Sequence, residues 1–151
     1  MDDLARLVAI EEIRQLKARY FRHMDMRDFD AMTQVFCRDA IFDCSDGSRI
    51  QDADGAWKGE AGPVTHGRDA IMAWIRQAFA DRTSAHHGHC HEVTIESATQ
   101  ARGIVAMQDH IRSRDRETRI MEAMGYYHER YRVEDGAWRI AETRLIRLFR
   151  G

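Results

Sequence analysis

Residues 126–148 read YYHERYRVEDGAWRIAETRLIRL, and this stretch decides the fold class. Large apolar residues alternate with polar ones on both sides of a turn at residues 134–136, whose sequence is EDG. Alternation with a period of two is typical of half-buried strands, and a short turn between two such strands predicts an antiparallel hairpin. The apolar positions expected to face the core are Tyr127, Tyr131, Trp138, Ile140, Leu145 and Leu148.

The same short period reaches upstream to His86. Turn-forming sequences, SATQ at 97–100 and SRDRE at 113–117, divide this region into strand-length segments. The apolar residues expected on the core side of these segments are Val93, Ile95, Ile104 and Ala106. The second half of the chain therefore predicts several strands joined by hairpins.

The first half shows the longer period of amphipathic helices. From Asp3 to about His23, apolar residues recur every three or four positions behind acidic residues that favour a helix N-terminus. A second helical pattern covers residues 66–81. The apolar side of the first helix comprises Leu4, Leu7, Val8, Ile13, Leu16, Tyr20 and Met24, and that of the second comprises Ile71, Trp74, Ile75 and Phe79.

The segment between the two helices is more varied. Asp28 is placed to cap a short helix that carries Phe29, Met32, Val35 and Phe36. A strand is expected at 40–45, followed at 46–63 by a polar hairpin or loop that Trp57 anchors. Helices early and strands late predict an α+β fold with helices covering one face of a curved sheet, in a single domain over 1–151.

Composition limits the partners of the chain. Among 151 residues, 44% are hydrophobic and the formal net charge is −2, which suits a packed globule without the basic surplus that nucleic acid binding requires. No stretch has the length and apolar character of a membrane helix, so no membrane partner is expected. Cys37, Cys44 and Cys90 are odd in number and lack a C-x-x-C spacing, so we expect no disulfide framework and a cytoplasmic location.

Half of the eight histidines lie in HHGHCHEV, residues 86–93. On a strand, His87, His89 and His91 would share one face and offer two ligands to a metal, although no spacing singles out a third ligand. The second interpretation is that these residues are surface or interface histidines. The third is that one of them is a catalytic base, and a bulge at Gly88 would let His86 point inward for that purpose.

A catalytic histidine needs a carboxylate to orient its ring and to stabilise the imidazolium. Asp25 is placed near the end of the first helix, five residues after Tyr20 in YFRHMDMRD. The two side chains share a face only if the helix loosens near its end. From the spacing alone, Asp25 as a turn cap and Tyr20 as a core residue remain open.

Three segments carry a resemblance to a known family. They are IEEIRQLKARYFRHMDMRDFDAM at 10–32, SAHHGHCHEVTIES at 84–97, and the stretch at 126–148. Together they resemble the SnoaL-like branch of the nuclear-transport-factor-2-like superfamily, which includes bile-acid 7-alpha-dehydratase and scytalone dehydratase. The resemblance implies a cone-shaped cystatin/NTF2-like roll, in which N-terminal helices pack on a strongly curved, mixed or antiparallel sheet and enclose a pocket.

The resemblance also implies a chemistry. Enzymes of this branch are lyases, or related isomerases, that need no cofactor and no metal; an Asp–His pair removes a proton while a leaving group departs. The matching positions here are Asp25 and His86, with Tyr20 in an assisting place. Arg147 matches an arginine near the end of the last strand, where it would stabilise an enolate or bind a carboxylate; a salt-bridged strand residue is the alternative.

Other substrate-binding residues follow less directly. Cys44 and Met24 stand where dehydratases of the branch carry tyrosines, and His89 is expected to line the pocket or support its neighbour. The apolar wall is expected from Met24, Met107, Met124, Phe42, Tyr126 and the tryptophans, for which plain core packing is the alternative.

The resemblance therefore implies a small, hydrophobic, cyclic or steroid-like substrate. It also implies a homo-oligomer, with a trimer favoured and a dimer as the alternative. The alternative function is a noncatalytic one on the same fold: a ligand-binding roll, or a structural subunit like the small subunit of ring-hydroxylating dioxygenases.

Overall fold

The first helix, α1 (Asp3–Asp25), begins where the Asp2 carboxylate accepts a hydrogen bond from the backbone N–H of Ala5 at 2.7 Å. The computed structural model describes all residues 1–151. Ile13, Leu16 and Tyr20 are buried as expected, but Leu4, Leu7 and Val8 are exposed. The apolar face of α1 is therefore used only from Ala9 onward, where the helix packs against the sheet.

The chain turns after α1 into a short helix, α2 (Phe29–Met32), which Asp28 caps as predicted. A 3-10 turn, Thr33–Val35, leads directly into β1 (Phe36–Asp43). Phe36 was expected in the short helix, and the strand was expected only from residue 40. The correction follows from pairing, because Phe36 lies opposite Ile140 of the last strand and is fully buried there.

Three short strands follow: β2 (Ile50–Gln51), β3 (Trp57–Lys58) and β4 (Val64–His66). The first two form the expected hairpin, but Trp57 does not anchor it in the core. Its indole is exposed and receives only the Arg49 guanidinium, 4.2 Å from the ring centroid. The next helix, α3 (Arg68–Ala78), buries Ile71 and Ile75 and packs against β1.

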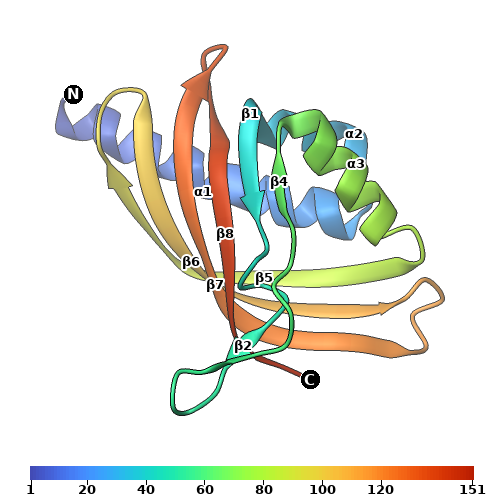
Figure 1. The fold of residues 1–151 in the computed structure, drawn as a ribbon. Coiled ribbons are helices and arrows are strands. Elements are labelled where there is room, and N and C mark those ends of the chain that lie inside the picture. The colour runs from blue at the N-terminus through green and yellow to red at the C-terminus, as the bar shows by residue number, and fades with distance from the viewer.

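Four long strands complete the chain: β5 (Arg82–Ile95), β6 (Gln100–Ser113), β7 (Arg119–Glu134) and β8 (Ala137–Arg150). They form an antiparallel meander, and β1 and β2 join the opposite side of β8 in parallel. The result is a mixed, open, eight-stranded sheet that curls around one face, with α1 crossing that face and α2 and α3 at one end (Figure 1). The predicted α+β class is confirmed.

The face of the sheet that packs on the helices differs in part from the sequence-based expectation. On β6 the buried residues are the odd-numbered ones, including Ala101, Val105 and Met107, so Ile104 and Ala106 lie on the outer face. Leu148, at the end of β8, is also exposed. Several inward positions of β6 carry small residues, so the hydrophobicity pattern does not indicate which face of this strand is buried.

A bulge changes the phase of β5. His89 pairs with Ala106 and Glu92 pairs with Ile104, so one extra residue is inserted between them, and Cys90 has a φ of 42°. The inward side therefore carries His86 before the bulge and His91 after it, whereas His87 and His89 are exposed. The bulge lies at Cys90 and not at Gly88, where it was expected.

None of the helices combines the length and the apolar composition needed to cross a bilayer.

Candidate active site

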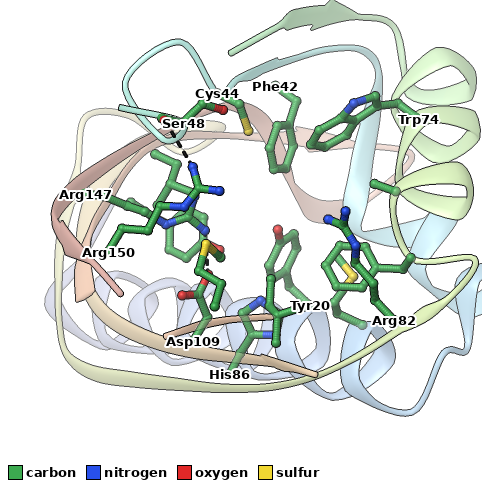
Figure 2. A pocket seen from close by; sticks show the side chains of 17 residues that line it. Tyr20, Phe42, Cys44, Ser48, Trp74, Arg82, His86, Asp109, Arg147 and Arg150 are labelled. Carbon is green, nitrogen blue, oxygen red and sulfur yellow. Dashed lines mark hydrogen bonds and ion pairs between the residues drawn. The ribbon is translucent and has the colours of Figure 1, made fainter. Parts of the chain in front are cut away.

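The concave face of the sheet and the helices enclose a cavity of about 180 Å³ (Figure 2). Its apolar wall comes from β1, α3 and the long strands, and its members include Phe42, Trp74, Phe79, Ile111, Met121 and Leu145. Its polar side chains are Tyr20, Ser48, Arg82, His86, Asp109, Tyr127, Arg147 and Arg150. A small set of polar groups within an apolar pocket is typical of sites that bind and orient small molecules.

The end of α1 and the beginning of β5 bring Asp25 and His86 together. The Oδ1 atom of Asp25 lies 2.6 Å from Nδ1 of the His86 ring, and Oδ2 accepts the backbone N–H of His86 at 2.8 Å. Because β5 is at the edge of the sheet, that N–H has no strand partner on this side, and the carboxylate supplies one. The hydroxyl of Ser84 donates a third hydrogen bond to Asp25, at 2.9 Å.

These contacts hold Asp25 as a carboxylate. Burial by itself would raise its pKa, but the hydrogen bonds and charge of His86, together with Ser84, outweigh burial and lower the pKa below its ordinary value. The ionised Asp25 accepts a hydrogen bond from Nδ1–H of His86, which fixes the tautomer of the ring. The Nε2 atom of His86 then carries the lone pair, and no protein group hydrogen-bonds to it at the cavity.

The His86 ring is also held from the side. Phe21 of α1 stacks on it with ring centroids 5.7 Å apart and planes 15° from parallel. Gly88, two residues along β5, leaves room for this phenyl ring, because a Cβ at that position would lie 2.4 Å from a ring carbon of Phe21. Gly88 therefore does not form the expected bulge but allows the close packing of Phe21 against β5.

Two tyrosines form the floor of the cavity beside His86. The rings of Tyr20 and Tyr127 meet edge to face with centroids 5.9 Å apart, and both residues are almost fully buried. Burial raises the pKa of Tyr20 well above its ordinary value, and Tyr127 and Glu129 raise it further. Tyr20 therefore stays protonated and is suited to donate a hydrogen bond.

Behind these rings lies a buried ion pair. Lys17 of α1 places Nζ 2.6 Å from Glu129 of β7, and 3.5 Å and 4.0 Å from the ring centroids of Tyr127 and Tyr20. Glu129 also accepts hydrogen bonds from the hydroxyls of Tyr131 and Thr143. The tyrosine rings are thus fixed on a fully hydrogen-bonded support.

Arg147 lines the cavity, and its guanidinium is already engaged in an ion pair. It donates to Asp109 Oδ2 at 2.6 Å and to the backbone carbonyl of Gly47. Asp109 is almost completely buried, and its Oδ1 atom and the Nε of Arg147 are both without a hydrogen-bond partner. A buried polar atom without a hydrogen-bond partner lowers the stability of the fold. The Asp109–Arg147 pair is therefore the polar part of the wall that can still form hydrogen bonds.

The remaining predicted site residues divide into two groups. Cys44 and Met24 line the cavity, and burial raises the pKa of the Cys44 thiol to about 12, which keeps it protonated. His89 and Met107 do not line it: His89 is on the exposed side of β5, ahead of the bulge, and Met107 is packed in the core. In the expected apolar wall, Phe42 and Trp74 are present, whereas the side chains of Tyr126 and Met124 belong to the other face of β7.

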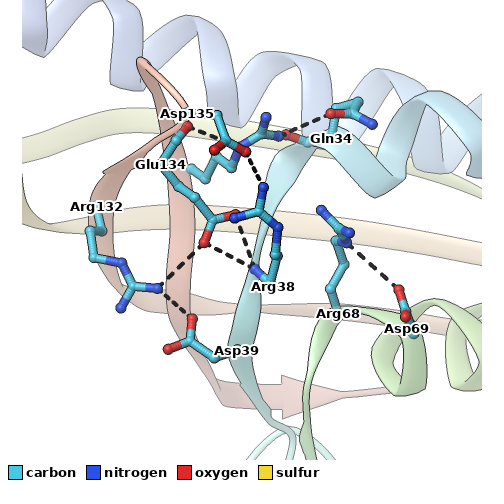
Figure 3. Close-up of polar contacts among 9 residues, drawn as sticks. Gln34, Arg38, Asp39, Arg68, Asp69, Arg132, Glu134 and Asp135 are labelled. Atoms are coloured by element: carbon cyan, nitrogen blue, oxygen red, sulfur yellow. Dashed lines mark hydrogen bonds and ion pairs between the residues drawn. The ribbon is translucent and has the colours of Figure 1, made fainter.

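One group of side chains of the types that bind metal ions lies close together in the structure. This group does not include the histidines of residues 86–91. Sγ of Cys37 and carboxylate oxygens of Asp39 and Glu134 lie within 4.8 Å of one another. These acids already have cationic partners, because the Arg132 guanidinium binds Asp39 and lies 3.7 Å from Glu134, and the Arg38 guanidinium lies 3.8 Å from Glu134 (Figure 3). We therefore interpret this group as an ion-pair network that ties β1 to the β7–β8 hairpin.

Sequence reasoning missed Asp109, Arg82 and Arg150. The only signal for Asp109 is register, because it lies directly opposite His86 on the neighbouring strand, and residues in that relation share a face. That register depends on the corrected phase of β6, which the apolar pattern did not reveal. Arg82 is the first residue of β5 and Arg150 the last residue of β8. The chain has many arginines, so nothing in the sequence distinguishes these two.

Comparisons with known proteins agree with this architecture. The family model described as "SnoaL-like domain" matches residues 5–144. Among solved structures, a candidate scytalone dehydratase from Novosphingobium aromaticivorans superposes with a TM-score of 0.79 at 18% identity, covering 97% of this chain and 89% of the other.

Two further structures are similar. Hexachlorocyclohexane dehydrochlorinase LinA-type3 from Novosphingobium barchaimii gives a TM-score of 0.75 at 15% identity, covering 99% of this chain and 93% of the other. ActVI-ORFA from Streptomyces coelicolor gives 0.66 at 14% identity, covering 91% and 96%. At such identities, these likenesses establish a shared fold.

Proposed function

The chain belongs to the SnoaL-like domain family, and from this premise we propose that it is a cofactor-independent lyase, or a related isomerase, acting on a small hydrophobic cyclic molecule. Two of its structural neighbours are named for elimination reactions, a dehydratase and a dehydrochlorinase. The observation that carries the proposal is the Asp25–His86 pair, whose free imidazole nitrogen lies at the cavity.

In the proposed reaction, Nε2 of His86 removes a proton from an acidic C–H of the substrate. The electron pair of that bond forms a C=C bond while the C–O bond to a hydroxyl group breaks. The imidazolium is stabilised by Asp25 and returns the proton to the departing hydroxide, so that water leaves and His86 is neutral again. General acid–base help of this kind accelerates reactions by about 10²–10⁴.

Tyr20 and the Arg147–Asp109 pair assist in this proposal. A protonated Tyr20 donates a hydrogen bond to the substrate oxygen on which negative charge develops. The unpaired oxygen of Asp109 is available to accept a hydrogen bond from a substrate hydroxyl. If the leaving step is absent and the proton returns to a different carbon, the same groups carry out an isomerisation.

A noncatalytic ligand-binding or structural role is the alternative. A binding cavity has no need for a histidine whose tautomer is set by a carboxylate and whose free nitrogen faces the ligand. The geometry of His86 therefore favours the enzyme.

The test measures proton abstraction without knowledge of the leaving group. A panel of cyclic ketones, with and without a β-hydroxyl, is incubated with the protein in deuterated water, and exchange at the carbon next to the carbonyl and loss of water are followed by NMR. We expect His86→Ala to lower the faster of these rates by about 10²–10⁴. The thermal midpoint should stay close to that of the wild type.

The matched control is His87→Ala, which removes the neighbouring exposed histidine and should leave both rates unchanged. Equal rates in the wild type and in His86→Ala would remove His86 from the mechanism. Ligand binding without exchange or elimination for any compound would favour the noncatalytic alternative.

A further inference from the structure

Two arginines at the cavity have no acidic partner. Arg147 is bound to Asp109, but neither Arg82 nor Arg150 has a carboxylate within ion-pair distance. Both residues are exposed, so they mark the solvent side of the cavity, and Asp109 is the only acid among the lining side chains. The entrance therefore carries positive charge that the protein does not neutralise.

The two guanidinium groups enter from opposite sides of the cavity (Figure 2). Arg82 begins β5, and its backbone carbonyl is held by the guanidinium of Arg27 at 2.6 Å. Arg150 ends β8, and one of its nitrogens donates to the backbone carbonyl of Ser48 at 3.1 Å. Arg82 is held through its backbone and Arg150 through one guanidinium nitrogen, so both side chains keep hydrogen-bond donors free for a ligand.

The inner part of the cavity limits the size of such a ligand. A dry cavity of about 150 Å³ holds benzene in a well-studied engineered case, so about 180 Å³ accommodates one ring with small substituents. Phe42, Trp74 and Phe79 provide the apolar surface for that ring. A steroid skeleton is larger than this volume and would extend out through the entrance.

We propose that the ligand is a one-ring organic anion, whose ring lies on the apolar wall near His86 and whose charged group binds Arg82 and Arg150. The placement of the reacting part of the ligand near His86 rests on the proposed function, and the proposal names the substrate class for that same site. Arginine binds carboxylate and phosphate with charge-assisted hydrogen bonds, and both anions share the required chemistry. The experiment distinguishes them.

Binding is measured by calorimetry and by NMR titration of the full chain with three probes: cyclohexanecarboxylate, its methyl ester and cyclohexyl phosphate. We expect at least one anion to bind about tenfold or more tightly than the ester, with the advantage falling at high salt because entrance charges are screened. In Arg82→Gln/Arg150→Gln, the affinity for that anion should fall about tenfold, while the affinity for the ester stays the same.

Arg6→Gln is the control, because Arg6 is an exposed arginine of α1 without an ion-pair partner, and its loss removes one positive charge, as each of the two entrance substitutions does. It should leave anion binding unchanged. The proposal is overturned if no anion binds more tightly than the ester, or if Arg6→Gln weakens anion binding as much as a single substitution at the entrance.

Failure of this inference is distinguishable from failure of the proposed function. His86→Ala should still bind the anion more tightly than the ester, because the charged group is held by Arg82 and Arg150. Selective anion binding without turnover of any compound would support the ligand class and contradict the lyase. Elimination from neutral ketones with no preference for anions would support the lyase and contradict the ligand class.

Discussion

At His91, a titratable ring lies next to a buried polar network. The Tyr131 hydroxyl donates a hydrogen bond to Glu129, so its oxygen accepts a hydrogen bond from Nε2–H of His91, 2.9 Å away. Burial lowers the pKa of His91 to about 4, although the Glu129 charge acts in the opposite direction. The bulge at Cys90 is what turns this ring inward, and so one inserted residue creates a pH-sensitive position.

His91 predicts a loss of stability in mild acid. The unfolded chain binds a proton at His91 near pH 6.5, whereas the folded chain does so only near pH 4. Between these values the unfolded state binds more protons, so the free energy of unfolding decreases as the pH falls through this window and is fully present above it. In His91→Gln, which keeps an N–H donor but cannot titrate, the thermal midpoint should fall less between about pH 7 and about pH 5.

His87→Gln is the control for that measurement, because the exposed ring of His87 has no such network around it. It should lose stability in acid as the wild type does. An unchanged acid response in His91→Gln would show that other groups dominate in this window.

At the scale of single residues, the sequence could supply the site only in part. Asp25, His86 and Tyr20 could be proposed from the resemblance, but their spacing also fits a turn cap and core residues. Asp109 could not be proposed, because its place opposite His86 depends on strand register. His89 was misplaced because alternation cannot locate a bulge.

Among the elements, α1 contacts the sheet through a charge as well as through apolar packing. Lys17 is almost fully buried, and burial lowers its pKa while Glu129 acts in the opposite direction. The chain therefore places a hydrogen-bonded ion pair where most helices present an aliphatic side chain. This pair fixes the rotation of α1, and with it the positions of Tyr20 and Asp25, relative to β7.

Lys17→Met should be strongly destabilising. It leaves the Glu129 carboxylate buried without its cation, and breaking one side of a buried pair costs about 3–5 kcal/mol. Urea denaturation measures the loss. Lys58→Met is the matched control, since the pair of Lys58 with Asp52 is exposed to solvent and its loss should change the stability little.

A second variant separates charge from packing. In Lys17→Met/Glu129→Gln no unpaired charge remains, so part of the lost stability should return. If the single and double variants are equally unstable, or if Lys17→Met is as stable as Lys58→Met, the buried charge is not what holds the helix.

The element types could be predicted because the periods of helices and strands differ. The face of β6 could not, because its inward positions include Ala101, Gly103 and Asp109, which carry little apolar signal, whereas the outer Ile104 gives a false one. Phe36 was assigned to a helix because a partner strand 100 residues away is invisible to local pattern. Long-range pairing, and not propensity, decided these positions.

The whole molecule keeps a row of apolar side chains on the outside of its sheet. Ala106, Tyr126 and Ile146 are directly opposite one another on β6, β7 and β8. Tyr126 and the nearby Leu148 are exposed. Exposed apolar side chains on a sheet face are typical of interaction sites, and we propose that a second copy of the chain covers Tyr126 and Leu148.

We expect the protein to be a homo-oligomer in solution, a trimer from the resemblance noted above. Light scattering coupled to gel filtration measures the mass. Tyr126→Lys/Ile146→Lys should yield monomers, whereas Leu4→Lys, at the exposed start of α1, should leave the mass unchanged. A wild-type monomer would contradict the expectation, and dissociation by Leu4→Lys alone would move the interface to α1.

The position of β8 in the sheet has a consequence for how the molecule is made. This strand pairs with β7 on one side and with β1 and β2 on the other, yet it follows them all in the sequence. During synthesis, β1 has no parallel neighbour until β8 has been translated. Until then, the apolar surfaces of the early helices and β1 stay exposed to solvent. Such distant pairing slows folding, and chaperones that shield nascent chains should have their longest contact with the segment from α2 to β4.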